Sequence, residues 1–177
     1  MGVFEVTGGK KLKGEIIPQG AKNEALQLIS AVLLTAEKVT INNIPDIIDV
    51  NLQIELLEDL GVTVERIDRH TCIFQADRVD VNYLSSPAFR KKTGRLRGSV
   101  MLAGPMLSRF KKAYVPKPGG DKIGRRRLDT HIIGFKKLGA RCDYDSDESF
   151  FHLHTSQLKG TYLLLDEPSV TGTANLV

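Results

Sequence analysis

The chain has 177 residues, of which 41% are hydrophobic and 26% charged, as expected of one globular domain or a large part of one. The longest apolar stretch, residues 25–36, is too short and too polar to span a bilayer, and the N-terminus lacks the pattern of a secretory signal, so we expect a cytoplasmic protein with no membrane partner. The net charge of +4 suits a polyanionic partner, either a nucleic acid or a phosphorylated metabolite.

The elements predicted in chain order form two similar series. In the first, a helix that is apolar nearly all round is expected at 23–35, a strand at 39–42, an amphipathic helix at 50–61, and strands at 62–67 and 71–75. In the second, a similar apolar helix is expected at 97–110, a strand at 113–115, an amphipathic helix at 128–139, and strands at 140–144 and 150–155. Gly61 and Gly139 follow the amphipathic helices at the position of a left-handed C-terminal cap.

These series predict an internal repeat with a period of about 75–80 residues. The two amphipathic helices have apolar residues at matching steps, with Val50, Ile54, Leu57 and Leu60 in the first and Leu128, Ile132, Phe135 and Leu138 in the second. A third unit is expected to begin at Ser169, with Asn175 at the position that Asn23 has in the first. Because a domain rarely ends one turn into a buried helix, we expect the chain to be part of a longer protein.

Two cationic residues stand where buried helices are predicted to begin. Lys22 and Asn23 lie at the start of the first, where free N–H groups and the helix dipole favour an anion, and Arg97 has the matching place in the second unit. The alternative is a solvated lysine with Asn23 as an ordinary N-cap. The repeat favours the anion site, because it brings the two helix starts to the same end of the structure.

A third candidate segment, residues 117–130, is rich in glycine and in positive charge. Asp121 follows Gly119 and Gly120 and could donate a proton if the site excluded water, whereas a solvated turn is the alternative. His131 is interpreted as a structural residue or an outer contact. No metal site is predicted, because Cys72 and Cys142 stand alone and the pair His152 and His154 lacks a third ligand at suitable spacing.

Taken together, the motifs resemble those of the UDP-N-acetylglucosamine 1-carboxyvinyltransferase family over essentially the whole chain. The residues that carry the resemblance are Gly20 to Asn23, Arg97 to Ser99 with Gly104 and Pro105, Pro118 to Gly124, Arg126 to His131, and Ser169 to Gly172. The resemblance implies an α/β fold, an inside-out barrel of repeated β-α-β-α-β-β units, here incomplete. It divides the chain into a strand region at 1–20, shared with a missing C-terminal domain, and an incomplete first domain at 21–177 with units at about 21–90 and 91–165 and a third from 169.

The resemblance also implies an activity and residue roles. The family transfers the enolpyruvyl group of phosphoenolpyruvate to the 3-hydroxyl of UDP-N-acetylglucosamine and releases phosphate, without a cofactor or a metal. Catalytic roles are implied for Lys22, Asp121 and Arg126, and phosphoenolpyruvate binding for Lys22 and Asn23. The residues implied to bind UDP-N-acetylglucosamine are Arg97, Arg126, Arg127, Leu128, Asp129, Thr130, Ser169 and Val170. The base for the sugar hydroxyl is expected in the missing half, so the chain alone is expected to be inactive.

The main departure from the family is Asp121, where many members have cysteine. A carboxylic acid can protonate the methylene carbon of phosphoenolpyruvate, but it is not readily alkylated by fosfomycin, so we expect resistance to that antibiotic. Thr171 and Glu167 also depart from the commonest pattern.

Two alternatives remain. One is a 5-enolpyruvylshikimate 3-phosphate synthase, although its opening helix usually carries Ser-Lys-Ser; the other is a basic nucleic-acid-binding module, although aromatic residues are only 6% of the chain.

Overall fold

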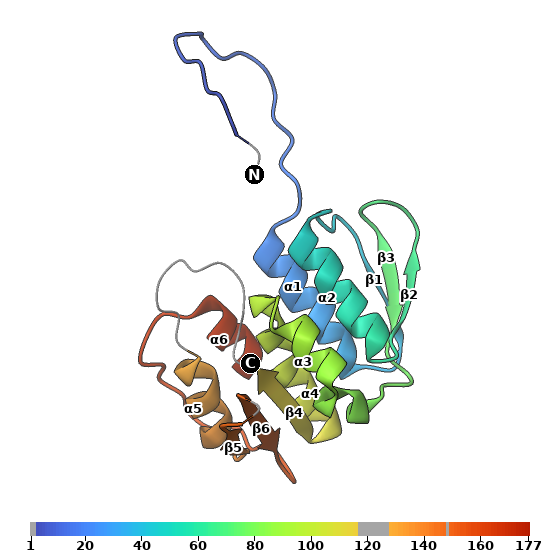
Figure 1. Ribbon diagram of the computed structural model, residues 1–177, viewed down its shortest axis with the longest axis vertical. Coiled ribbons are helices and arrows are strands. Elements are labelled where there is room, and N and C mark those ends of the chain that lie inside the picture. The colour runs from blue at the N-terminus through green and yellow to red at the C-terminus, as the bar shows by residue number, and fades with distance from the viewer. Residues whose placement is uncertain (1–2, 117–127, 148) are drawn as a thin grey trace.

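A computed structural model describes residues 3–116, 128–147 and 149–177 of the chain. Its elements form two units that repeat one arrangement (Figure 1). The expected Gly-Gly-Asp loop, with Asp121, Arg126 and Arg127, lies outside the described residues. No helix among the described residues is both long enough and apolar enough to cross a membrane.

The first unit alternates two helices with a small sheet. Its elements are helix α1 (Lys22–Ala31), the 3-10 turn η1 (Val32–Leu34), strand β1 (Lys38–Ile41), helix α2 (Ile48–Asp59), and strands β2 (Thr63–Arg66) and β3 (Cys72–Gln75). The strands form an antiparallel sheet in the order β1-β3-β2, with Val39 and Val64 both opposite Phe74. Phe74 is fully buried, so the register turns this face of the sheet toward the helices.

The second unit repeats this order. Its elements are the 3-10 helix η3 (Arg97–Leu102), helix α4 (Ala103–Phe110), strand β4 (Lys112–Pro116), helix α5 (Asp129–Lys137), and strands β5 (Arg141–Asp145) and β6 (Phe150–His154). Its antiparallel sheet has the order β4-β6-β5, equivalent to the first, with Ala113 and Cys142 both opposite Leu153. The predicted repeat and the α/β class are therefore confirmed.

The connection between the units was not predicted. It forms the 3-10 helix η2 (Val81–Ser85) and helix α3 (Pro87–Thr93). Asp80 and Ser86 cap these elements by accepting hydrogen bonds from the backbone N–H groups of Asn82 and Phe89. Among the described residues, no strand precedes the buried helix in either unit, so the leading strand of the expected β-α-β-α-β-β formula is not seen here.

Both amphipathic helices end at the predicted glycines. Gly61 has φ 94° and Gly139 has φ 97°, the left-handed conformation that only glycine adopts without strain. At Gly61 a Cβ atom would also lie 2.4 Å from the carbonyl oxygen of Arg78. The glycine therefore allows the chain to leave α2 close to the connection that follows the first sheet.

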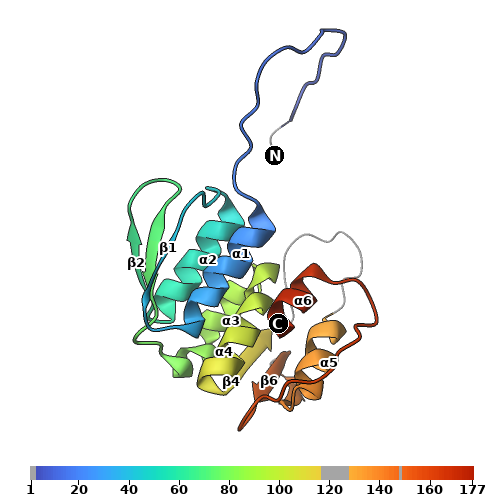
Figure 2. The same cartoon turned by 180° about the vertical axis from the view of Figure 1, so that it is seen from behind.

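The helices pack against one another and against the inner faces of the sheets (Figures 1 and 2). In α1 and η1, Ile29 and Leu33 are fully buried, but Leu28 and Leu34 remain 48% and 52% exposed. The prediction that this helix is buried nearly all round is thus wrong at these two positions. The elements that pack against α1 and η1 are α2, η3 and α4.

The last helix, α6 (Val170–Leu176), packs against η3, α4 and α5 (Figure 1). It begins after Ser169, whose hydroxyl accepts a hydrogen bond from the Gly172 N–H. Asn175 is the sixth residue of α6 and is buried, whereas Asn23 is the second residue of α1 and is exposed. The expected correspondence between Asn175 and Asn23 is therefore wrong.

Residues 3–20 extend away from the two units and form no strand in this structure (Figures 1 and 2). The apolar side chains in this segment, Val3, Phe4, Val6, Leu12, Ile16 and Ile17, are at least 84% exposed. A strand requires a hydrogen-bonded partner, and the described chain supplies none to this segment. The expected pairing of residues 1–20 with another domain stays a prediction.

Candidate substrate pocket

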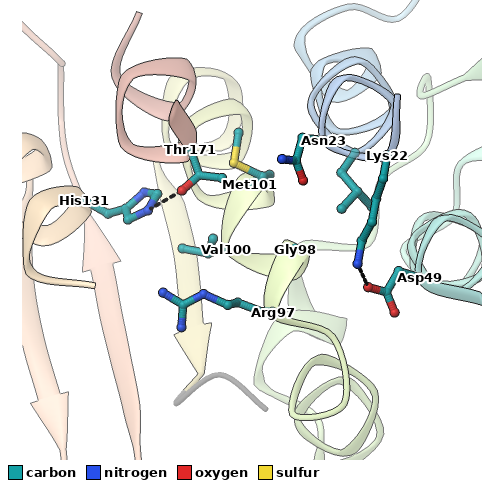
Figure 3. Close-up of a pocket in the computed structure, with 10 residues that line it drawn as sticks. Lys22, Asn23, Asp49, Arg97, Gly98, Val100, Met101, His131 and Thr171 are labelled. Atoms are coloured by element: carbon teal, nitrogen blue, oxygen red, sulfur yellow. Dashed lines mark hydrogen bonds and ion pairs between the residues drawn. The ribbon is translucent and has the colours of Figure 1, made fainter. Parts of the chain in front are cut away.

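A cavity of about 370 Å³ lies where α1, α2, η3, α5 and α6 meet (Figure 3). Three of the predicted site residues, Lys22, Asn23 and Arg97, line this cavity. The other lining residues are Leu26, Asp49, Gly98, Val100, Met101, His131 and Thr171. The structure thus brings together the two cationic helix starts that the repeat placed at one end.

Lys22 is the first residue of α1 and lines the cavity, with its side chain directed toward Asp49 (Figure 3). The N-cap of this helix is Ala21, so the alternative in which Asn23 is the N-cap is wrong. No described side chain caps α1, and its first-turn N–H groups add to the positive potential of Lys22. Asp49, in the first turn of α2, forms an ion pair with Lys22.

Asp49 was not predicted as a site residue, although the repeat contained a signal for it. Val50 matches Leu128 in the two amphipathic helices, so Asp49 takes the place of Arg127, which the resemblance implied to bind substrate. The Lys22 and Asp49 side chains are 48% and 37% exposed. An ion pair this exposed contributes little to stability, so an anion entering the cavity can displace Asp49 from Lys22 at small cost.

Arg97 is the first residue of η3 and also lines the cavity (Figure 3). Gly98, the next residue, packs against Leu26 of α1, where a Cβ atom would lie 2.8 Å from a methyl carbon. Because η3 approaches α1 so closely, Arg97 and Lys22 line the same cavity. The two cations come from different units, so the site depends on how the units pack.

His131 was interpreted from the sequence as a structural residue or an outer contact, and its place in this cavity was not predicted. It is only 2% exposed, yet it lines the cavity, and its ring reaches from α5 to Thr171 and Asn175 of α6. Its Nδ1 lies 3.1 Å from Asn175 Nδ2, and its Nε2 lies 3.4 Å from Thr171 Oγ1. Burial, together with the nearby charge of Arg97, lowers the pKa of His131 to about 4. The imidazole is therefore neutral at pH 7.

The remaining predicted site residues that the structure describes lie outside this cavity. The Thr130 hydroxyl donates to Glu167 at 3.2 Å, and Thr130 lines a second cavity of about 100 Å³ with residues 163–166. Leu128 packs against the core, and Asp129 is exposed in the first turn of α5. Ser169 caps α6, and Val170 is 69% exposed. Among the described residues, no group of three or more His, Cys, Asp or Glu could hold a metal ion.

Known proteins resemble this chain in both sequence and fold. A family model described as EPSP synthase (3-phosphoshikimate 1-carboxyvinyltransferase) matches residues 6–177. A UDP-N-acetylglucosamine 1-carboxyvinyltransferase from Porphyromonas gingivalis is 59% identical over 177 residues, all of this chain and 41% of that protein. A protein of the same name from Bacteroides fragilis is 58% identical with the same coverage.

Solved structures show the same fold at low sequence identity. The enolpyruvyl transferase NikO from Streptomyces tendae has a TM-score of 0.68 at 20% identity and covers 85% of this chain and 32% of its own. An EPSP synthase from Acinetobacter baumannii has a TM-score of 0.66 at 15% identity and covers 96% of this chain and 38% of its own. The chain thus spans about 41% of the length of the first two curated relatives. On this evidence, it belongs to the EPSP synthase (3-phosphoshikimate 1-carboxyvinyltransferase) family.

Proposed function

We propose that this chain works as part of a longer enzyme that transfers the enolpyruvyl group of phosphoenolpyruvate to the 3-hydroxyl of UDP-N-acetylglucosamine and releases phosphate. The observation that carries the proposal is that Lys22 and Asn23 from the first unit and Arg97 from the second line one cavity. The relatives that are 58–59% identical over the whole chain carry the name of this activity and support the choice of acceptor.

The charges that line the cavity suit two anionic substrates. Lys22 and Arg97 supply two positive charges, and Asp49 supplies one negative charge that is paired with Lys22. Phosphoenolpyruvate carries a phosphate and a carboxylate, and the nucleotide sugar carries a diphosphate. We assign Lys22 and Asn23 to the phosphoenolpyruvate side and Arg97 to the nucleotide-sugar side.

The proposed chemistry is addition followed by elimination. Asp121, as the general acid, gives a proton to the methylene carbon of phosphoenolpyruvate, which makes the neighbouring carbon electrophilic. The sugar hydroxyl oxygen bonds to that carbon and loses its proton to a base. In the second step the methyl group loses a proton, the carbon–oxygen bond to phosphate breaks, and the enolpyruvyl double bond forms again.

Further positions complete the proposed nucleotide-sugar site. They are Arg126, Arg127, Leu128, Asp129, Thr130, Ser169 and Val170. Of these positions, Thr130 lines the second cavity, together with residues 163–166. A cytoplasmic enzyme that uses no cofactor is part of the same proposal, because both substrates are soluble metabolites.

Phosphate release tests the proposal and distinguishes the two acceptors. The chain is expressed together with its downstream coding sequence and is supplied with phosphoenolpyruvate and either UDP-N-acetylglucosamine or shikimate 3-phosphate. We expect release only with the nucleotide sugar, and none from the 177-residue chain by itself. Release with shikimate 3-phosphate alone would assign the other acceptor, and binding of a random oligonucleotide without binding of the nucleotide sugar would favour the nucleic-acid alternative.

A further inference from the structure

Asn175 is a buried asparagine whose orientation the backbone determines. Its Oδ1 accepts a hydrogen bond from the Gly104 N–H at 2.8 Å, and its Nδ2 donates to the Val100 carbonyl oxygen at 2.8 Å. A backbone N–H can only donate and a carbonyl can only accept, so the reversed amide would lose both bonds. Because Asn175 is 6% exposed, water is not available to replace them.

The orientation of Asn175 determines the tautomer of His131. The amide Nδ2 that faces His131 Nδ1 at 3.1 Å is a donor, so Nδ1 must be the acceptor and the ring proton must lie on Nε2. A proton on Nδ1 would face the amide hydrogens in a buried site. The lowered pKa of about 4 agrees with a ring that stays neutral.

Few described charges act on this ring. Arg97 faces it across the cavity, and its positive charge opposes protonation. α6 carries no charged residue between Val170 and Leu176, and α5 carries Asp129, Lys136 and Lys137. The backbone-fixed amide is therefore the neighbour that decides which nitrogen holds the proton.

Thr171 continues the series toward the cavity. Its Oγ1 lies 3.4 Å from His131 Nε2 and accepts the Nε2–H in a long hydrogen bond (Figure 3). A hydroxyl that accepts in this way keeps its own hydrogen to donate elsewhere, and the bonds in such a series strengthen one another. Thr171 lines the cavity opposite the α1 residues Lys22 and Asn23.

We propose that Asn175, His131 and Thr171 form a hydrogen-bond relay, with each member donating to the next, that presents the Thr171 hydroxyl as a directional donor to an anionic oxygen of the ligand. Asn175 and His131 are positioning residues, and Thr171 makes the contact. The relay consists of neutral groups, so it adds a hydrogen-bond donor without adding to the two positive charges of Lys22 and Arg97. The nature of the ligand, a phosphate ester, rests on the proposed function, whereas the direction of the relay does not.

The direction is tested by NMR of the imidazole nitrogens in the 177-residue chain, with the His131 signals assigned from His131→Gln. We expect the wild-type ring to carry its proton on Nε2 and to stay neutral at pH 7. Asn175→Asp replaces the donating amide with a carboxylate and is expected to move the proton to Nδ1 or to protonate both nitrogens. A wild-type ring with the proton on Nδ1, or doubly protonated at pH 7, would overturn the relay.

The contact is tested by calorimetry with two probes, inorganic phosphate and UDP-N-acetylglucosamine. Thr171→Val keeps the side-chain shape and removes the hydroxyl, and we expect roughly tenfold weaker binding. Thr171→Ser keeps the hydroxyl and is expected to bind nearly as the wild type does. Equal affinities for Thr171→Val and the wild type would overturn the proposed contact. So would a wild-type chain that binds neither inorganic phosphate nor UDP-N-acetylglucosamine. If phosphate shows the expected pattern and the nucleotide sugar does not bind, the relay stands and the proposed function fails.

Discussion

Arg109 holds the two units together through three backbone carbonyls. From α4 in the second unit, its Nη1 donates to the carbonyl oxygens of Leu33 at 3.0 Å, Thr35 at 2.8 Å and Ala76 at 2.8 Å, all in or next to the first unit. The guanidinium also lies 4.9 Å from the Phe110 ring centroid. Because the cavity lies between the units, this contact supports the site as well as the fold.

Replacing Arg109 with methionine keeps most of the apolar stem and removes the donors. One nitrogen has two hydrogens for three acceptors, so at least one bond is shared. Hydrogen bonds from a charged donor contribute about 1.5–3 kcal/mol each, and partial exposure reduces their sum. We expect Arg109→Met to lower the free energy of unfolding by about 3 kcal/mol, or the melting temperature by about 6–12 °C for a chain of this size.

Urea and thermal unfolding measure this change, with Lys112→Met as the matched control. Lys112 is an exposed cation on β4, and its replacement is expected to change the free energy of unfolding by less than about 0.5 kcal/mol. Arg109→Lys should recover part of the loss, since a single ammonium group can reach some of the carbonyls. A change below about 0.5 kcal/mol for Arg109→Met would refute the reasoning.

Three further predictions concern the site. The pKa of His131 is about 4 in the folded chain, against an ordinary value of 6.5. Between these two pH values the unfolded state binds more protons than the folded state. This histidine should therefore make the free energy of unfolding rise by about 3 kcal/mol from pH 4 to pH 7. His131→Gln should lower this rise by about the same amount; an equal rise in the wild type and the variant would contradict the assignment. Asp49→Asn should tighten inorganic phosphate binding about two- to fivefold at low salt, by calorimetry, because it frees Lys22 at a half-exposed ion pair; weaker binding would contradict this role. Asp121→Cys should make the full-length protein sensitive to fosfomycin with a covalent mass increase, whereas inactivation of the Asp121 protein would show that the carboxylate does not protect.

The repeat was predictable from the sequence because it depends on local patterns. Apolar spacing of 3.6 residues identifies the helices, and glycines mark their C-terminal ends, as Gly61 and Gly139 confirm. Placing Lys22 and Arg97 at equivalent helix starts was then enough to predict that they meet. The structure confirms this, since both line one cavity.

What could not be predicted depends on contacts between distant residues. His131 contacts Thr171 and Asn175, which are 40 and 44 residues away along the chain, and no spacing rule relates them. The short helix α3 was missed because its seven residues show no clear apolar stripe, although Ser86 followed by Pro87 is a typical helix start. The exposed side of α1 was missed because its apolar residues alone do not show what covers them.

The central claim, that the cavity at Lys22 serves enolpyruvyl transfer, is tested most directly by one steady-state measurement. Phosphate release from phosphoenolpyruvate and UDP-N-acetylglucosamine is compared for the full-length protein, Lys22→Ala and the control Lys38→Ala, which removes an exposed cation on β1. The account predicts a loss of at least about a hundredfold in kcat/KM for Lys22→Ala, roughly the 2.7 kcal/mol expected of a charged contact with phosphate, and no change for Lys38→Ala. Equal rates for the two variants would contradict it.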